Sequence, residues 1–186
     1  MGGGSTWLTG TSDPATETLF WPTGNPFPNS DDRDRPGDNL FTNCILALDP
    51  NTGKLKWHYQ FTPHDTFDWD ATEPPVLVDT VYRGEPRKLL LHADRNGFFY
   101  VFDRTNGKLL LAEKFVSRLT WASGIGADGR PQRLPPGEIR CPEDATNWNA
   151  TAFSPVTRLY YVMAYEKCVV KLSSANRGPS AQEDAG

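Results

Sequence analysis

The sequence predicts an all-β fold built from the blades of a β-propeller, and three observations support this prediction. The 186 residues include 16 glycines and 16 prolines, which demand many turns and favour a loop-rich β architecture. No stretch shows the apolar period of an amphipathic helix, whereas short apolar runs bounded by turn residues recur along the chain. One pattern of strand, turn and strand is also repeated, as is typical of propeller blades.

The repeated pattern consists of an apolar strand end, an aspartate, a tight turn, a Gly-Lys pair and a returning strand. It occurs at residues 47–57 (ALDPNTGKLKW) and again at residues 101–111 (VFDRTNGKLLL). A looser third copy lies at residues 154–160. A single copy is common in hairpin-rich proteins, but two close copies and a third favour a propeller.

The first part of the chain is predicted to form two short strands, residues 2–8 and 18–21, joined by a polar turn. Residues 25–39 contain too many prolines and aspartates for a helix or a strand, so we expect a loop there. Residues 40–49 and 54–61 should then form a hairpin whose turn places Gly53 where a positive φ is needed.

The rest of the chain is predicted to continue in the same way. Residues 124–141 are expected to form a long loop rich in proline and glycine. From residue 173 onward the chain has no period and few apolar residues, so we expect one domain over residues 1–172 and a disordered tail over 173–186. Strands are predicted at residues 76–82, 88–93, 98–102, 108–112 and 158–164.

Composition and charge exclude several functions. The net charge of -4 and the pI near 5.4, with scattered lysines and arginines, argue against nucleic-acid binding. No apolar run reaches the length of about 18 residues that a membrane span needs. The N-terminus lacks the charged and apolar regions of a secretory signal, which taken alone predicts a cytoplasmic product.

The three cysteines, Cys44, Cys141 and Cys168, do not have the spacing of metal ligands. Cys141 and Cys168 could pair across a hairpin in an oxidising compartment, and isolated semi-buried thiols are an equal alternative.

Residues 62–70 (TPHDTFDWD) are the most unusual stretch, because they place three carboxylates and a histidine within nine residues. Carboxylates this close repel one another in a low dielectric unless a cation or hydrogen-bond donors compensate. The stretch is therefore either a solvated loop or a site organised by a metal ion. Composition alone favours the loop, and the neighbouring motifs favour the metal site.

Several motifs resemble those of the quinoprotein alcohol dehydrogenases, eight-bladed propellers that use pyrroloquinoline quinone (PQQ). Residues 47–57 are similar to the tryptophan-docking motif that locks adjacent blades in that family, although the second copy has Leu111 in place of the tryptophan. The resemblance extends from residue 1 to about residue 171 and implies a partial propeller. The other matching segments, in the family's order, are GGGSTW (2–7), TGNP (23–26), RPGDN (35–39), PHDTFDWD (63–70) and DRNG (94–97).

This resemblance implies three residues that bind PQQ. Trp7 matches the family's indole that stacks on the planar quinone, and its alternative is a tryptophan of the propeller core. Arg95 matches the arginine that donates hydrogen bonds to the reactive quinone carbonyls, and its alternative is a solvent-facing turn arginine. Asn147 resembles a further asparagine in contact with PQQ.

The resemblance also implies three metal ligands. Asn25 matches an asparagine whose amide oxygen binds the ion, although by itself it is a typical turn residue before a proline. Asp68 matches the carboxylate that contacts the ion and acts as general base. Asp70 would face the same side as Asp68 in an extended segment. An aspartate there resembles the lanthanide-dependent branch, whereas calcium-dependent methanol dehydrogenases have a small residue, so a lanthanide is favoured over Ca²⁺.

The activity implied is oxidation of a short-chain primary alcohol to an aldehyde, with hydride transfer to PQQ, Lewis-acid help from the ion and single electrons passed to a cytochrome c. The family resemblance implies a periplasmic full-length protein. Because complete propellers of the family are much longer, we expect a fragment that is weakly active or inactive alone, with the remaining blades encoded elsewhere. A non-catalytic propeller scaffold and a sugar-oxidising quinoprotein are the alternatives.

Overall fold

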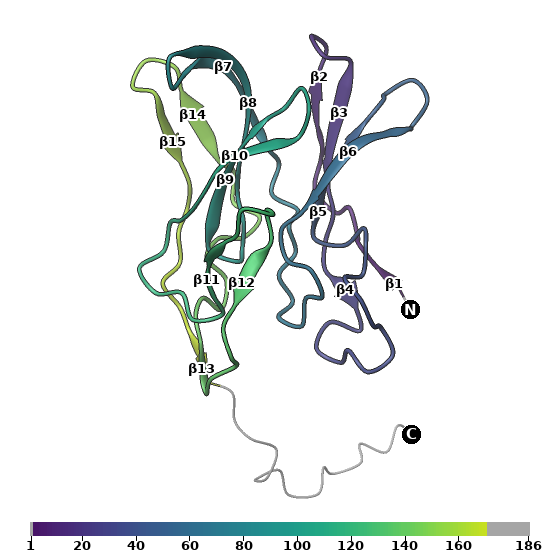
Figure 1. The fold of residues 1–186 in the computed structure, drawn as a ribbon, viewed down its shortest axis with the longest axis vertical. Helices are drawn as coiled ribbons and strands as arrows, with labels where there is room; N and C mark the ends of the chain where they lie inside the picture. The colour runs from purple at the N-terminus through teal and green to yellow at the C-terminus, as the bar shows by residue number, and fades with distance from the viewer. Residues whose placement is uncertain (1, 171–186) are drawn as a thin grey trace, which may run out of the picture.

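The computed structural model describes residues 2–170, in which all regular structure is β-strand (Figure 1). Two four-stranded antiparallel sheets form the body of the molecule and stand side by side. The first contains, in spatial order, β2 (Thr11–Asp13), β3 (Thr18–Pro22), β5 (Cys44–Leu48) and β6 (Leu55–Gln60). The second contains β7 (Val76–Tyr82), β8 (Glu85–Ala93), β9 (Phe98–Asp103) and β10 (Lys108–Lys114).

Four short strand pairs accompany the two sheets. Because β14 contacts β7, the hairpin of β14 and β15 adds the beginning of a third unit beside the second sheet. This succession of antiparallel sheets is the architecture of propeller blades, as the sequence predicts. The short pairs are β1 (Gly2–Gly3) with β4 (Pro26–Phe27), β11 (Ala122–Ile125) with β12 (Pro131–Arg133), β13 (Ile139–Arg140) with β16 (Val169–Val170), and β14 (Ala152–Ser154) with β15 (Leu159–Tyr161).

Three local predictions are wrong. The strand predicted over residues 2–8 is limited to β1, because Gly3 and Gly4 have positive φ angles that end the extended backbone. The turn predicted between the first two strands contains β2. The loops predicted at residues 25–39 and 124–141 contain β4, β12 and β13, since short edge pairings tolerate prolines that a longer strand would not. The tail predicted at residues 173–186 lies outside the described residues.

The main core lies between the two large sheets and is mostly aromatic. The Tyr59 ring from β6 lies 4.8 Å from that of Phe102 on β9, and the Phe61 ring lies 4.9 Å from that of Tyr100, measured between centroids. Phe61, Tyr100 and Phe102 are fully buried. Burial of aromatic surface between the sheets is therefore the main force that holds the two blades together.

Trp57, which ends the first copy of the repeat, docks on the turn of the second copy. A Cβ atom added to Gly107 would lie 2.7 Å from Cδ2 of Trp57, so only glycine leaves room for the indole. The same indole lies 5.6 Å from the Phe20 ring and 6.4 Å from the Phe102 ring, between centroids. The predicted tryptophan docking thus joins the first blade to the second.

A buried ion pair makes a second connection between the blades. Nε of Arg104, which follows β9, donates to Oδ2 of Asp13 on β2 at 2.6 Å, and both side chains are buried. Burial alone would raise the pKa of Asp13, but the hydrogen bonds from Arg104 and Thr16 outweigh it and the pKa is lowered. Asp13 is therefore held in its ionised form at the start of the first blade.

A disulfide links Cys141 to Cys168, so the paired alternative is the one observed. It joins the residue after β13 to the residue before β16 and so crosslinks this strand pair, whereas Cys44 is a buried free thiol. None of residues 2–170 form a helix that could cross a membrane.

Candidate functional site

The candidate site is centred on Arg95, which lies in the turn between β8 and β9. The turn is closed by Asp94, whose Oδ1 accepts a hydrogen bond from the Asn96 backbone N–H at 2.9 Å, and by Gly97 with its φ of 96°. Arg95 is only 8% exposed, so its charge must be compensated within the protein. The turn therefore projects a buried guanidinium toward the loops of the neighbouring blades.

The predicted PQQ-binding residues lie together around this guanidinium. Nη2 of Arg95 donates a hydrogen bond to Oδ1 of Asn147 at 2.8 Å. The guanidinium carbon lies 5.9 Å from the centroid of the Trp7 ring, within the range of a cation–π contact. Trp7 is 45% exposed, so its indole is accessible in this chain. Residues 7, 95 and 147 come from three separate segments and meet at one place.

Asp70 connects the acidic stretch to both Arg95 and Asn25. Oδ2 of Asp70 lies 3.7 Å from Nη2 of Arg95, and Oδ1 accepts a hydrogen bond from the backbone N–H of Asn25 at 2.9 Å. A Cβ atom at Gly24 would lie 2.2 Å from that same Oδ1, so glycine is required for the close approach. The TGNP turn and the acidic stretch are thus packed directly against each other.

Asn25 keeps its amide oxygen free of hydrogen bonds among residues 2–170. Its Nδ2 donates to the carbonyl oxygen of Pro26 at 3.0 Å, and its backbone N–H is taken by Asp70. This arrangement fixes the side chain and leaves a neutral oxygen donor beside a carboxylate, which is a donor set suited to a hard cation.

The expectation that Asp68 and Asp70 share one face of an extended segment is wrong. Residues 62–70 contain no strand, and Asp68 has a φ of 67°, in the left-handed region. The carboxylate of buried Asp65 causes this curl, because it accepts hydrogen bonds from the backbone N–H groups of Phe67 at 2.7 Å and Trp69 at 2.9 Å. Asp68 reaches the site through its carbonyl oxygen, 3.3 Å from Nη1 of Arg95, while its side chain is exposed.

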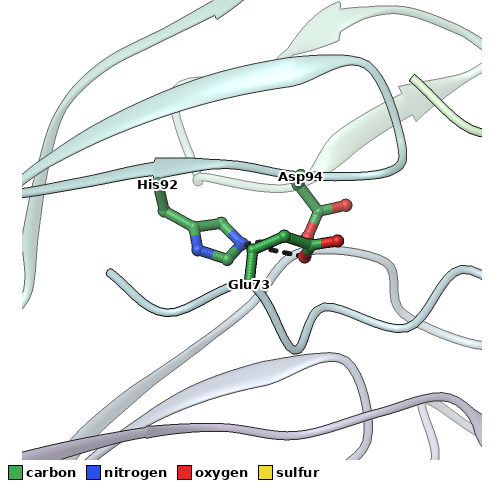
Figure 2. A group of neighbouring side chains, drawn as sticks. All are labelled: Glu73, His92 and Asp94. Atoms are coloured by element: carbon green, nitrogen blue, oxygen red, sulfur yellow. Dashed lines mark hydrogen bonds and ion pairs between the residues drawn. The ribbon is translucent and has the colours of Figure 1, made fainter. Parts of the chain in front are cut away.

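A second layer of buried polar groups, next to Arg95, consists of Glu73, His92 and Asp94. Figure 2 shows how these three side chains face one another. Nε2 of His92 lies 3.3 Å from Oδ2 of Asp94 and 4.0 Å from Oε2 of Glu73. Oε1 of Glu73 lies 3.7 Å from Nε of Arg95. Burial raises the pKa of Glu73, and the nearby charge of Asp94 raises it further.

Sequence reasoning missed this second layer and also Asp144, whose Oδ1 lies 3.7 Å from Nη1 of Arg95. A signal was present for His92, a polar residue near the end of the apolar run of β8, and for Asp94 two positions later, just after the strand. The three side chains of the second layer offer ligand-type atoms within 4.8 Å of one another. Because Arg95 already supplies positive charge there, we interpret them as support for its position rather than as ligands.

The fold and the site together define a β-propeller protein in which an indole face, a buried arginine and a group of oxygen donors converge between blades. The family model described as glucose/ethanol/alcohol dehydrogenase, beta-propeller domain, with the short name PQQ, matches residues 1–120. The chain belongs to this family of PQQ-dependent dehydrogenases, which confirms the resemblance and the propeller fold.

Relatives of known activity agree with the family. The chain is 44% identical over 173 residues to the quinohemoprotein alcohol dehydrogenase of Comamonas testosteroni, covering 88% of this chain and 24% of that protein. It is 36% identical to the lanthanide-dependent methanol dehydrogenase of Methylorubrum extorquens, covering 90% of this chain and 31% of that protein. The chain therefore spans about a quarter to a third of the length of these relatives.

Solved structures give the same result. The quinohemoprotein alcohol dehydrogenase of Comamonas testosteroni superposes with a TM-score of 0.81 at 42% identity, covering 88% of this chain and 26% of that one. A europium-containing methanol dehydrogenase superposes with a TM-score of 0.82 at 37% identity, covering 88% of this chain and 30% of that one.

Proposed function

We propose that this chain is part of a PQQ-dependent alcohol dehydrogenase that oxidises primary alcohols to aldehydes and passes electrons to a cytochrome c. The observation that carries the proposal is the meeting of Trp7, Arg95 and Asn147 beside the contact of Asp70 with Asn25. The related proteins named as alcohol, butanol and methanol dehydrogenases support the same reaction class.

The residues present suit PQQ, a flat quinone that carries three carboxylates. Nε of Arg95 faces Oε1 of Glu73 at 3.7 Å, so the Nη groups, which lie beside Asn147 and Asp70, are the donors that would serve the cofactor. The exposed Trp7 indole offers a flat apolar surface for a planar ring. Asn147 would hold Arg95 in its orientation and contact the cofactor. PQQ, when bound, supplies the acceptor for the two electrons of the alcohol.

The residues proposed as the metal site are Asn25, Asp68 and Asp70, of which Asn25 and Asp70 are in contact in this structure while the Asp68 side chain is exposed. An amide oxygen and two carboxylates form a hard donor set that suits Ca²⁺ or a lanthanide ion. The second carboxylate, from Asp70, favours the trivalent ion because it adds negative charge beside it. Arg95 lies 3.7 Å from Asp70 and would partly neutralise that charge, which limits the preference. The europium and lanthanide in the names of two relatives agree with this choice.

Asp68 is the proposed general base. Its side chain is exposed, while its backbone carbonyl is held by Arg95 at 3.3 Å. The carboxylate therefore has access to a substrate hydroxyl, and its backbone is fixed relative to the cofactor site. Removal of the hydroxyl proton by Asp68 would accompany departure of hydride from the substrate carbon. Arg95 would stabilise negative charge that develops on the acceptor.

We further propose that the chain acts within a longer periplasmic protein. The Cys141–Cys168 disulfide fits an oxidising compartment. Exposed apolar side chains of the β14–β15 hairpin, Val156 in its turn and Leu159 and Tyr161 on β15, suit a surface that a further blade would cover. An isolated chain that lacks the remaining blades should have weak activity or none.

The test is dye-linked ethanol oxidation with added PQQ and either La³⁺ or Ca²⁺, measured for this chain and for a full-length protein that contains it. We expect turnover from the full-length protein, a loss of about 100-fold or more in Asp68→Asn, and a selective loss of La³⁺-supported activity in Asp70→Ser. A full-length protein that binds neither ion by calorimetry would instead favour the non-catalytic scaffold. Faster oxidation of glucose than of ethanol would favour the sugar-oxidising alternative.

A further inference from the structure

A cavity of about 540 Å³ lies against the acidic stretch, and none of the candidate site residues line it. Thr66 and Phe67 form part of its wall, and Thr120, Trp121 and residues of the segment from Arg133 to Arg140 form most of the rest. This volume is in the range of sites that bind small molecules. The cavity is therefore large enough to hold a ligand of its own.

Two arginines line the cavity without a carboxylate partner. Arg133 and Arg140 both contribute to its wall, and none of the described residues that line it is acidic. Neither guanidinium forms an ion pair within residues 2–170. Two guanidiniums without an ion-pair partner on the wall of one cavity favour an anionic ligand there.

Aromatic rings fix both guanidiniums in place. The guanidinium carbons of Arg140 and Arg133 lie 4.9 Å and 5.8 Å from the centroid of the same Phe67 ring. Arg140 also lies 5.7 Å from the Trp69 ring. Both guanidiniums are thus positioned against the same aromatic ring on the cavity wall.

The donors of Arg140 are unused. Its Nε is buried and has no hydrogen-bond partner among the described residues, and desolvation by burial lowers the pKa of Arg140. Arg133 is partly used, because Nη2 donates to the carbonyl oxygens of Pro63 and His64. A buried donor without a partner is costly, so a ligand that accepts its hydrogen bond would be bound favourably.

We propose that this cavity binds a small organic acid, with its carboxylate on Arg133 and Arg140 and its apolar body against Trp121, Leu134 and Ile139. The planar guanidinium matches a carboxylate through paired hydrogen bonds. The apolar side chains on the same cavity wall give an organic carboxylate an advantage over a simple inorganic anion. The cavity uses none of the residues proposed for PQQ or its ion, so this inference does not depend on the proposed function.

Isothermal titration calorimetry of the chain without PQQ or metal tests the proposal, with three probes. Benzoate carries both the carboxylate and an apolar body, benzamide has the same shape without the charge, and inorganic phosphate has the charge without the body. We expect benzoate to bind and the other two to bind at least about tenfold more weakly. Absence of benzoate binding, or equal binding of benzamide or phosphate, would overturn the assignment.

Variants locate the binding. Arg140→Gln and Arg133→Gln should each weaken benzoate binding by about tenfold, because each removes a charge-assisted hydrogen bond. Arg133 is exposed, so its variant tests the site even if Arg140→Gln loses its fold through the contact with Trp69. Arg83→Gln, in the hairpin between β7 and β8, removes the same charge away from the cavity and should bind benzoate as the native chain does. Equal affinities in all three variants would contradict the proposal.

Discussion

Substitution of Gly107 by alanine tests whether tryptophan docking joins the two blades. The added Cβ would lie 2.7 Å from Cδ2 of Trp57, a distance that real Cβ contacts do not show, and the φ of 76° at Gly107 is also unfavourable for alanine. The left-handed backbone costs about 1–2 kcal/mol. Displacement of the indole adds about 1–3 kcal/mol of overpacking. We therefore expect Gly107→Ala to lower the free energy of unfolding by about 2–5 kcal/mol.

Gly53 provides a matched control, since it occupies the same turn position in the first copy of the repeat. Its φ is 69°, but an added Cβ would meet no atom within 4 Å. Gly53→Ala should therefore lose only the backbone term of about 1–2 kcal/mol. Thermal unfolding followed by circular dichroism should place the midpoint of Gly107→Ala about 2–12 °C below that of Gly53→Ala, at about 2–4 °C per kcal/mol. Equal midpoints would show that Trp57 does not hold the blades together.

Three further predictions concern buried groups. Asp13→Asn should lower the unfolding free energy by about 1–3 kcal/mol, because buried Arg104 loses one of its two carboxylate partners and keeps Asp79. Since the pKa of Asp13 is lowered in the folded chain, its stabilisation is present above the unfolded pKa of about 3.9 and is lost as the pH falls below that value, which urea unfolding between pH 2 and 6 would show. The pKa of Glu73 is raised in the folded chain, so the stability that its protonated carboxyl group contributes is present below the unfolded pKa of about 4.3 and is lost as the pH rises. The unfolding free energy of Glu73→Gln should therefore rise relative to that of the native chain between pH 5 and 8. A difference between the two that does not change with pH would contradict a neutral Glu73 in the folded chain. Reduction of Cys141–Cys168, which are 27 residues apart, should remove about 3.5 kcal/mol, whereas an unchanged melting temperature in reductant would show that the disulfide does not stabilise the fold.

The blades could be predicted from the sequence because their determinants are local. The Asp, turn and Gly-Lys pattern at residues 47–57 and 101–111 encodes two hairpins directly, and the turn glycines have the positive φ that the pattern requires. The short strand pairs were not predicted, because two-residue strands such as β4 and β13 depend on a partner strand distant in sequence. Such short strands show no periodic pattern of apolar residues.

The candidate site was predicted by resemblance, and its geometry depends on interactions that no local pattern reveals. The left-handed backbone at Asp68 arises because the Asp65 carboxylate accepts hydrogen bonds from two backbone N–H groups. The expectation of an extended backbone from Asp68 to Asp70 therefore failed. Glu73 and Asp144 reach Arg95 from loops distant in sequence. Only the folded chain shows that the guanidinium has three carboxylate neighbours.

The most direct measurement is a diffraction structure of the protein with PQQ and Eu³⁺, with the ion located by its anomalous signal. The proposed site predicts one strong peak between the amide oxygen of Asn25 and the carboxylates of Asp68 and Asp70, with the quinone on the Trp7 indole. A peak at Glu73, His92 and Asp94 instead, or a quinone away from Trp7 and Arg95, would contradict the assignment.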